Sequence, residues 1–454
     1  MPCVRTMIGY MAIFVLAAAA PGLAQPTGVT AYEVTSIGVL EGHRVSSAQE
    51  LDEFARIVGL SGNAPHKTVL WVNGELFTPT VPPGGETGNF AGISPTSGLI
   101  VGSSLVNDRS RPAAWRIGGG STMLPLLGGS IICYSATAND YGWIVGGCAA
   151  ADRSALWPRL DAPIDLGSLG NQFGDEGAND INELGEIVGR SSNAQHITRP
   201  YLWRDGQMID IGGEPTDAWG FANGINDFTE VVGYFSNPPP GRREAYFWRN
   251  GEITVLPEPY PPCGLHKARE INDAGIIVGQ AGDANCNRLY ATVWERDDNF
   301  HPYLLNDHIP RHPDVTLVTA DDVNEAGQIA AFGEYDDGRA RGFLVTPYLF
   351  EMSDPAPGIA GQPNIITVTG LQPDQRILLA YGTREGAQRI RPDCAGGTLL
   401  IRDPQASPIV RADQSGVATI TVNVPQAARG RTIRMQALAP FECEISHTVT
   451  WTFE

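Results

Sequence analysis

Short apolar runs alternate with turn residues from Asp52 to Val345, and this alternation repeats seven times. Each copy contains a tight turn, an Ile-Val-Gly strand and a later strand that ends in Trp. The clearest copy reads I-N-D-A-G-I-I-V-G over Ile271–Gly279 and continues to Y-A-T-V-W at Trp294. A fixed period of this length indicates a repeat architecture.

Two residues mark the period. The strand glycine occurs at Gly59, Gly102, Gly146, Gly189, Gly233 and Gly279, with Ala331 in the seventh copy. The tryptophan occurs at Trp71, Trp115, Trp157, Trp203, Trp248 and Trp294, with Val345 in the seventh copy. Successive glycines are 43, 44, 43, 44 and 46 residues apart. We expect the tryptophans to pack between neighbouring repeats.

The copy at residues 178–213 shows how one repeat folds. Its first strand leads into the turn Asn182–Gly185, and Asn first with Gly fourth is what a type I turn prefers. After the Ile-Val-Gly strand, a third strand at Pro200–Trp203 is joined to a fourth at Met208–Ile211 by Asp205-Gly206, a strong hairpin signal. Four short antiparallel strands in each copy predict a propeller blade.

The ends of the repeat region indicate a closed ring. The seventh copy has no convincing fourth strand after Val345, whereas an unmatched segment, Ile37–Gly42, precedes the first copy. This segment resembles Leu166–Gly170, which we interpret as the fourth strand of the third copy. We therefore expect the strand around Ile37–Leu40 to complete the last blade, because a closed ring leaves no free edges. An open solenoid of stacked sheets is the alternative.

After residue 349 the period stops. Residues 350–358 predict a short, stiff linker, and residues 359–454 contain alternating runs such as Val417–Val422 that are typical of a small β-sandwich. The predicted fold class is therefore all-β. A seven-bladed propeller over residues 28–349, closed by an N-terminal strand, would be followed by a sandwich domain.

The N-terminus has the pattern of a cleaved signal peptide over residues 1–24. Arg5 precedes an apolar run at 7–20, and the small residues Gly22 and Ala24 precede the expected cleavage site. A membrane anchor is the alternative, but the run is short for a transmembrane helix. We expect a secreted protein, periplasmic or extracellular, with no membrane span.

Six cysteines remain after the leader, and an oxidising compartment would pair them. Six cysteines allow 15 pairings in principle, but two pairs each flank one hairpin turn and the last two share the C-terminal segment. We predict the disulfides Cys133–Cys148, Cys263–Cys286 and Cys394–Cys443. The rival interpretation is zinc binding, but no C-x-x-C or clustered His occurs, so no metal site is expected.

The formal net charge of −19 argues against nucleic-acid binding, which needs Lys and Arg to neutralise phosphates. The repeated turns place an acidic residue at the equivalent position of five blades, and these residues would share one rim. They are Asp140, Glu183, Asp227, Asp273 and Glu325. Such a ring would attract a cation or a basic partner, although exposed turns also favour Asp and Glu without any function.

The sequence lacks the catalytic motifs G-x-S-x-G and H-E-x-x-H. It also lacks the phosphate-binding Walker loop and the calcium-binding EF-hand loop. His308 and His312 cannot share a helical face, because Pro310 lies between them. A glycosidase needs two converging carboxylates, whereas adjacent acidic residues in turns are usually solvated. The adjacent acidic pairs are Asp297-Asp298, Asp321-Asp322 and Asp336-Asp337. The catalytic residues stay unknown, and no cofactor is expected.

The motifs I-N-D-A-G-I-I-V-G, Y-L-W-R-D-G-Q and I-D-L-G-S-L-G resemble the bacterial extracellular repeats called the HAF family, over roughly residues 37–345. This resemblance implies a secreted repeat protein without a settled enzymatic activity, so no catalytic residue is carried over. In the C-terminal segment, T-V-T-G-L-Q-P-D-Q and A-D-Q-S-G-V-A-T resemble accessory sandwich modules of secreted bacterial proteins.

Three functions fit these observations. We expect a non-catalytic, monomeric binding or scaffold protein whose propeller loops contact a protein or glycan ligand. The alternative is a carbohydrate-active hydrolase or lyase with its site in the propeller funnel. A third reading is a surface protein whose sandwich docks to the envelope. The enzyme requires two or three convergent acidic, His or Tyr side chains at the axis, so the lining of the axis discriminates between the functions.

Overall fold

The computed structural model describes residues 31–62, 66–86, 88–148, 153–170, 176–213, 219–237, 242–261, 263–389, 398–441 and 444–454. Within these ranges the chain forms β-strands and three short 3-10 helices: η1 (Arg296–Asp298), η2 (Leu305–His308) and η3 (Gln426–Ala428). The all-β class predicted from the sequence is confirmed.

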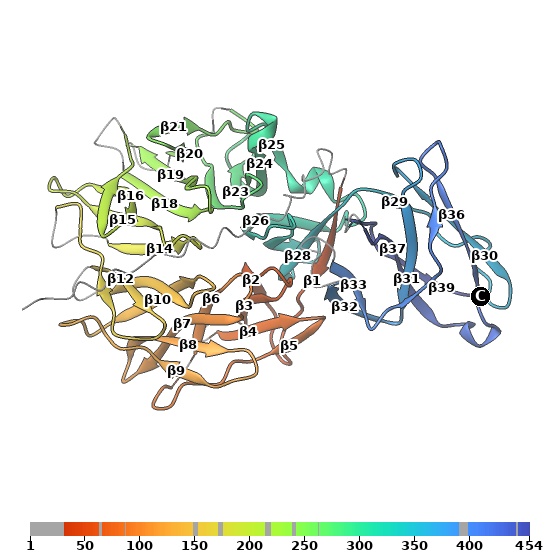
Figure 1. The fold of residues 1–454 in the computed structure, drawn as a ribbon, viewed down its shortest axis with the longest axis horizontal. Coiled ribbons are helices and arrows are strands. Elements are labelled where there is room, and N and C mark those ends of the chain that lie inside the picture. The colour runs from red at the N-terminus through yellow and green to blue at the C-terminus, as the bar shows by residue number, and fades with distance from the viewer. Residues whose placement is uncertain are drawn as a thin grey trace, which may run out of the picture.

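Seven four-stranded antiparallel sheets form the propeller blades (Figure 1). Blades 1 to 3 contain β2 (Ser46–Leu51), β3 (Ile57–Ser61), β4 (Lys67–Val72) and β5 (Glu75–Phe77); β6 (Asn89–Ile93), β7 (Leu99–Val106), β8 (Arg109–Arg116) and β9 (Ser121–Met123); and β10 (Cys133–Ala138), β11 (Trp143–Cys148), β12 (Arg153–Pro158) and β13 (Ile164–Asp165).

Blades 4 to 6 contain β14 (Gly177–Ile181), β15 (Ile187–Ser192), β16 (Thr198–Arg204) and β17 (Gln207–Asp210); β18 (Trp219–Ile225), β19 (Val231–Asn237), β20 (Arg242–Arg249) and β21 (Glu252–Val255); and β22 (Lys267–Ile271), β23 (Ile276–Gly282), β24 (Leu289–Glu295) and β25 (Pro302–Leu304). Blade 7 contains β26 (Val315–Val323), β27 (Ile329–Tyr335), β28 (Ala340–Tyr348) and β1 (Ala31–Ser36). We call the first strand of each repeat the inner strand. Each inner strand contacts that of the next blade, and β26 contacts β2, so the ring is closed.

The N-terminal strand closes the ring as predicted, but the predicted position of this strand was wrong. Blade 7 is completed by Ala31–Ser36, which pairs with β28 from Ala31↔Tyr348 to Ser36↔Phe343. Ile37–Leu40 follows it as the connection to blade 1. The Leu40 N–H donates to Ser61 Oγ at 3.0 Å, just as the Leu169 N–H donates to Ser191 Oγ at 2.9 Å. The two segments are therefore equivalent, as the sequence comparison indicated, but both lie after the outer strand.

The Ile-Val-Gly glycines have no room for a side chain. In the first six blades, a Cβ on this glycine would lie 1.9 to 2.2 Å from a carbonyl oxygen of the inner strand. The inner strand bulges there. Asn179 of β14 has no pairing partner on β15 beside Gly189, and Arg269 of β22 has none on β23 beside Gly279. The regular spacing of the glycines along the chain thus follows from a bulge repeated around the ring.

The turns that join the first two strands keep one geometry. Gly142, Gly185, Gly275 and Gly327 have φ between 70° and 82°. In two degenerate copies the same left-handed position is held by Ala55 (φ 56°) and Thr229 (φ 59°). The turn therefore forms even where glycine is missing, although a left-handed conformation costs a non-glycine residue about 1 kcal/mol.

The blades pack face to face through mixed apolar clusters. One cluster joins Val58 and Leu70 of blade 1 to Phe90, Ile100 and Trp115 of blade 2. Most of the repeated tryptophans are buried, and their indole N–H groups can donate to the backbone, as Trp157 does to Pro125 O at 2.7 Å. The tryptophans therefore lie in the core between blades, as expected from the sequence.

Two further sheets follow the propeller and share a core. One contains β29 (Glu351–Met352), β30 (Pro363–Thr369) and β36 (Ala418–Asn423); the other contains β31 (Arg376–Gly382), β34 (Gln405–Ala406), β35 (Val410–Arg411), β37 (Thr432–Ala439), β38 (Glu444–Ile445) and β39 (Val449–Thr452). A hairpin of β32 (Arg384–Arg389) and β33 (Thr398–Arg402) lies beside the propeller (Figure 1), where Leu400 packs with Ile37 and Trp71. The expected linker lies along β30, because the Ala356 N–H donates to Ile365 O at 2.9 Å.

Two of the predicted disulfides are confirmed. Cys133–Cys148 joins directly opposed residues of β10 and β11, with Cα atoms 4.0 Å apart, and Cys263–Cys286 is also formed. These bonds indicate an oxidising, non-cytoplasmic compartment. Across the described ranges, no helix is long and apolar enough to span a membrane.

Cys394 and Cys443 lie outside the described residues, so their pairing stays a prediction. Peptide mapping under non-reducing conditions should recover them in one cross-linked pair. A cross-link from either cysteine to a propeller cysteine would contradict both this pairing and the expected division between propeller and sandwich.

Candidate functional site

Two cavities meet on the propeller axis. The wide cavity, of about 670 Å³, is lined by residues near the start and the bulge of the inner strands. The turn cavity, of about 300 Å³, is lined by the ends of the inner strands and by the repeated turns of all seven blades. Four carboxylates line both cavities, and we call them the axial carboxylates. They are Glu50, Asp180, Glu270 and Asp322.

The axial carboxylates occupy one repeat position, directly after the bulge of the inner strand. Asp180 accepts the Ile181 N–H of its own blade at 2.7 Å and the Ile225 N–H of the next blade at 2.8 Å. Asp322 makes the matching pair of bonds, to Val323 at 2.8 Å and to Leu51 at 2.7 Å. Each aspartate therefore ties two neighbouring inner strands together at the axis.

The side chains of the two glutamates also extend toward neighbouring blades. Glu50 accepts the Ile93 N–H of blade 2 at 2.8 Å and the Thr137 hydroxyl of blade 3 at 3.1 Å. Glu270 accepts its own Ile271 N–H at 2.9 Å, and a Cβ on Gly224 would lie 2.3 Å from Glu270 Oε1. The arrangement places four acidic groups where the two cavities meet.

Burial raises the pKa of every axial carboxylate, and the neighbouring carboxylates raise it further. The pKa of Asp180 rises to about 6 and that of Asp322 to about 7, although hydrogen bonds from the backbone oppose the rise. The pKa values of Glu50 and Glu270 lie well above the ordinary range of a glutamate for the same reasons. Near neutral pH the cluster therefore shares protons.

These shifts predict that the protein is more stable near pH 5 than near pH 8. In the unfolded chain these carboxyls lose their protons near pH 4. The folded protein keeps the protons to a higher pH, so it binds more protons than the unfolded chain between about pH 4 and pH 7, and its stability falls as the pH rises through that window.

Thermal unfolding at several pH values checks this prediction. Glu270→Gln keeps an acceptor for Ile271 and removes the titrating group, so it should flatten the pH dependence. Glu252→Gln on the outer strand β21 is the matched control and should leave the dependence unchanged. A wild-type melting temperature that rises from pH 5 to pH 8 would contradict the assignment.

The wide cavity also carries basic and amide side chains. Asn179 and Asn223 occupy the bulge position and donate to the next blade, to Ala222 O and Ala268 O, each at 2.7 Å. Arg269 occupies the same position in blade 6 and pairs with Asp321 of blade 7 at 3.3 Å. This lining can bind hydroxyl and carboxylate groups, since it presents donors and acceptors side by side.

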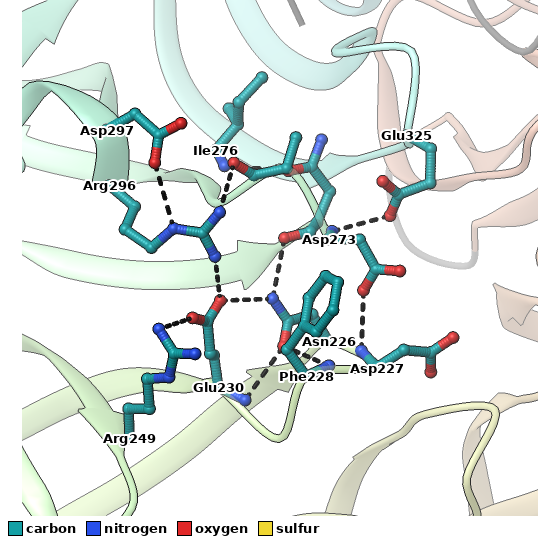
Figure 2. A network of polar contacts seen from close by, with 12 residues as sticks. Asn226, Asp227, Phe228, Glu230, Arg249, Asp273, Ile276, Arg296, Asp297 and Glu325 are labelled. Atoms are coloured by element: carbon teal, nitrogen blue, oxygen red, sulfur yellow. Dashed lines mark hydrogen bonds and ion pairs between the residues drawn. The ribbon is translucent and has the colours of Figure 1, made fainter. Parts of the chain in front are cut away.

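The predicted acidic rim lies around the turn cavity, as expected, and its carboxylates hydrogen-bond to the backbone of the neighbouring blades. Asp140 accepts the Thr96 and Ser97 N–H groups, each at 2.8 Å. In the other blades, the backbone N–H of each rim residue donates to the side-chain carboxylate of the rim residue in the next blade. These bonds join Asp140 to Glu183 (2.8 Å), Glu183 to Asp227 (2.8 Å), Asp227 to Asp273 (2.8 Å), Asp273 to Glu325 (2.9 Å) and Glu325 to Glu53 (3.0 Å). Figure 2 shows the part of this chain from Asp227 to Glu325.

A second ring of bonds lies beside the rim. The side-chain amide of each turn asparagine donates to the backbone carbonyl of the next turn, as Asn226 does to Asn272 O at 3.0 Å. We call the two rings together the turn belt. Burial raises the pKa of Glu183 to about 7 and that of Glu325 to about 8. The turn belt therefore gives the acidic rim a structural role, and binding of a cation or a basic partner there stays a prediction.

One buried carboxylate anchors the turn belt in blade 5. Glu230 accepts from Asn226 Nδ2 at 2.8 Å and pairs with Arg296 at 2.7 Å and with Arg249 at 3.2 Å (Figure 2). Arg296 comes from blade 6, so this ion pair also crosses between blades. Sequence reasoning did not identify Glu230.

The two histidines considered as metal ligands contact other parts of the propeller instead. His312 accepts the Val34 N–H at 3.2 Å and so holds the closing strand, while the ring of His308 lies 4.7 Å from that of Tyr303. Among the described residues, no group of three or more His, Cys, Asp or Glu could hold a metal ion. Of the adjacent acidic pairs, only Asp321-Asp322 lines the axial cavities of the described chain.

Comparisons with known proteins give fold-level likenesses only. No protein-family model matches the chain, and no curated protein is significantly similar to it. A catalytically inactive virginiamycin B lyase from Staphylococcus aureus, solved with quinupristin, aligns with a TM-score of 0.46 at 11% identity, over 69% of this chain and 99% of that one. A streptogramin B lyase aligns with a TM-score of 0.42 at 10% identity, over 70% and 98%.

A gluconolactonase from Xanthomonas campestris aligns with a TM-score of 0.34 at 12% identity, over 70% of this chain and 89% of that one. The chain is a propeller-like repeat protein that is structurally similar to these proteins, and no family follows from likenesses at this level.

Proposed function

We propose that this protein is a secreted binding protein whose wide cavity binds a polyhydroxylated ligand such as an oligosaccharide. The observation that carries the proposal is the lining of the cavity of about 670 Å³, to which inner strands contribute amide, guanidinium, ammonium and carboxylate groups. A ligand with many hydroxyl groups satisfies such a set of fixed donors and acceptors, whereas an apolar ligand would leave them unpaired.

Two further observations support this proposal. Trp219, at the start of the inner strand of blade 5, is 54% exposed, and an exposed indole ring is a suitable platform for the apolar face of a sugar. The disulfides and the resemblance to the HAF repeats are in keeping with a role outside the cytoplasm.

A variant that fills the cavity tests the proposal. Ala91→Trp places an indole in the wide cavity, whose wall includes Ala91. Calorimetric titration against a panel of neutral and acidic oligosaccharides should show binding to the wild type and at least about tenfold weaker binding to this variant. Ala162→Trp, on an exposed loop before β13, is the matched control and should bind as the wild type does. Equal binding by the Ala91→Trp variant would contradict the proposal.

A carbohydrate-active hydrolase or lyase is the second candidate, and the convergence of the axial carboxylates favours it. In the part of the chain that the structure describes, Glu270 accepts one hydrogen bond, from Ile271. A carboxyl that keeps its proton near neutral pH can donate it to a leaving glycosidic oxygen. If the protein cleaves a bound polysaccharide, Glu270→Gln should abolish turnover and spare binding. Turnover that persists in this variant would exclude Glu270 as the acid.

A further inference from the structure

Basic residues gather on one wall of the wide cavity, although the whole chain has a formal net charge of −19. Lys267 and Arg269 come from the inner strand of blade 6, and both line the cavity. Arg243 of the neighbouring blade lies close enough to repel Lys267. A local cluster of cations in an acidic protein requires an explanation, because like charges destabilise one another.

Lys267 lacks an anionic partner. Its Nζ lies 4.4 Å from the ring centre of Tyr234, which itself stacks on Phe221 with centroids 4.8 Å apart. Among the described residues, no carboxylate lies within ion-pair distance of Nζ. Burial, Arg243 and Arg269 lower the pKa of Lys267 to about 8. The aromatic ring holds the ammonium at the wall but leaves its three N–H donors for another acceptor.

Arg269 has unused hydrogen-bonding capacity at the same wall. Its Nη1 pairs with Asp321 at 3.3 Å, and its Nη2 donates to Gln280 Oε1 at 3.4 Å. The Nε atom is buried and has no hydrogen-bond partner within the described residues. The side chain as a whole is 40% exposed, and a guanidinium carries five N–H donors, so Nη1 and Nη2 each have a second N–H for a ligand acceptor.

We propose that Lys267 and Arg269 bind the carboxylate of an acidic sugar, so that the ligand of the wide cavity is an oligosaccharide containing uronic acid. This inference rests on the proposed function and names its substrate class. One carboxylate matches one ammonium and the remaining N–H donors of the two terminal guanidinium nitrogens. The sugar hydroxyls then donate to Asp321 and to the axial carboxylates.

The charge of the remaining wall favours a carboxylate over a phosphate. Asp321 already takes part of the charge of Arg269, and Glu270 and Asp180 line the same cavity. A phosphate group carries a charge of about −1.5 to −2 at neutral pH, which one ammonium and a shared guanidinium would not neutralise. A single delocalised charge beside several hydroxyl groups fits this mixed wall better.

The test compares the two lysines of the chain, Lys67 and Lys267. Binding of tri-galacturonic acid and of a neutral galactose trisaccharide is measured by calorimetry on the wild type and on two variants. Lys267→Met should weaken binding of the acidic trisaccharide at least about tenfold more than it weakens binding of the neutral one, because only the acidic ligand loses an ion pair. Lys67→Met, at an exposed position on β4, is the matched control and should change neither.

A covalent readout checks the same site independently of calorimetry. Limited acetylation followed by mass spectrometry should modify both lysines, and tri-galacturonic acid should protect Lys267 but not Lys67. Acidic binding that is unaffected by Lys267→Met, or protection of neither lysine, would overturn the inference.

The outcomes separate this inference from the proposed function. If only the neutral trisaccharide binds, and Ala91→Trp abolishes that binding, the proposed function stands and the acidic subsite is wrong. If inorganic phosphate protects Lys267 and the acidic trisaccharide does not, the carboxylate assignment is overturned. If no oligosaccharide binds in the wide cavity, both proposals fail.

Discussion

Removal of the residues before Ile37 is expected to lower the free energy of unfolding by about 5 kcal/mol. The deletion removes β1, which supplies the outer strand of blade 7 and buries Tyr32 and Val34. Burial of each such side chain contributes about 1.5–3 kcal/mol, and the β28 edge also loses its hydrogen-bonding partner. Thermal unfolding of the truncated chain, compared with the chain that starts at Gln25, measures the loss.

A peptide of residues 31–36 provides the control for this prediction. Added in excess to the truncated chain, the peptide should refill the open edge and raise the melting temperature again. Tyr32→Ala in the full chain should give part of the loss, because its hydroxyl also bonds Tyr303 at 2.9 Å. If the truncated chain and the longer chain had the same melting temperature, the stability of the ring would not depend on its N-terminal strand.

Replacement of Glu230 by Ala is expected to cost about 3 kcal/mol. The Glu230 side chain is fully buried and accepts from Asn226 while pairing with Arg296 and Arg249 (Figure 2). Removal of one partner from a buried charge network costs about 3–5 kcal/mol, and the partly exposed arginines reduce this value because water solvates them. Chemical denaturation of the purified variant measures the effect.

Two variants show whether the loss comes from this network. Asp297→Ala removes an exposed carboxylate that pairs with the same Arg296 at 3.4 Å, so its effect should stay within about 0.5 kcal/mol. Glu230→Gln keeps an acceptor for Asn226 and should recover part of the loss. If the Glu230→Ala and Asp297→Ala variants were equally stable, the turn belt would not depend on this anchor.

The sequence pattern predicts the blades well because their core strands are strongly apolar and their turns use Asn and Gly at fixed positions. It misplaces the closing strand for a physical reason. Outer strands are short and exposed, as at Ile164–Asp165, so they leave a weak hydrophobic pattern. The connection after them contains the buried Leu166 and therefore has the stronger apolar signal. The comparison with this copy therefore directs attention to Ile37, although β1, unlike that outer strand, is largely buried at Tyr32 and Val34.

The axial carboxylates were harder to predict, because strict alternation places only every second side chain of a strand on one face. The inner-strand bulge breaks this rule, and consecutive residues such as Asp321 and Asp322 both line the wide cavity. A signal is present in the repeat: an acidic residue stands two positions before the turn Asn or Asp in four copies, at Glu50, Asp180, Glu270 and Asp322. Only the ring geometry shows that these four positions converge.

A crystal structure of the protein with tri-galacturonic acid tests the central claim most directly. The account predicts the trisaccharide in the wide cavity, with a carboxylate within hydrogen-bond distance of Lys267 Nζ and of a terminal nitrogen of Arg269, and with hydroxyl groups facing Asp321. A trisaccharide bound at the acidic rim, on the outer strands or on the C-terminal sheets, with the wide cavity free of sugar, would contradict it.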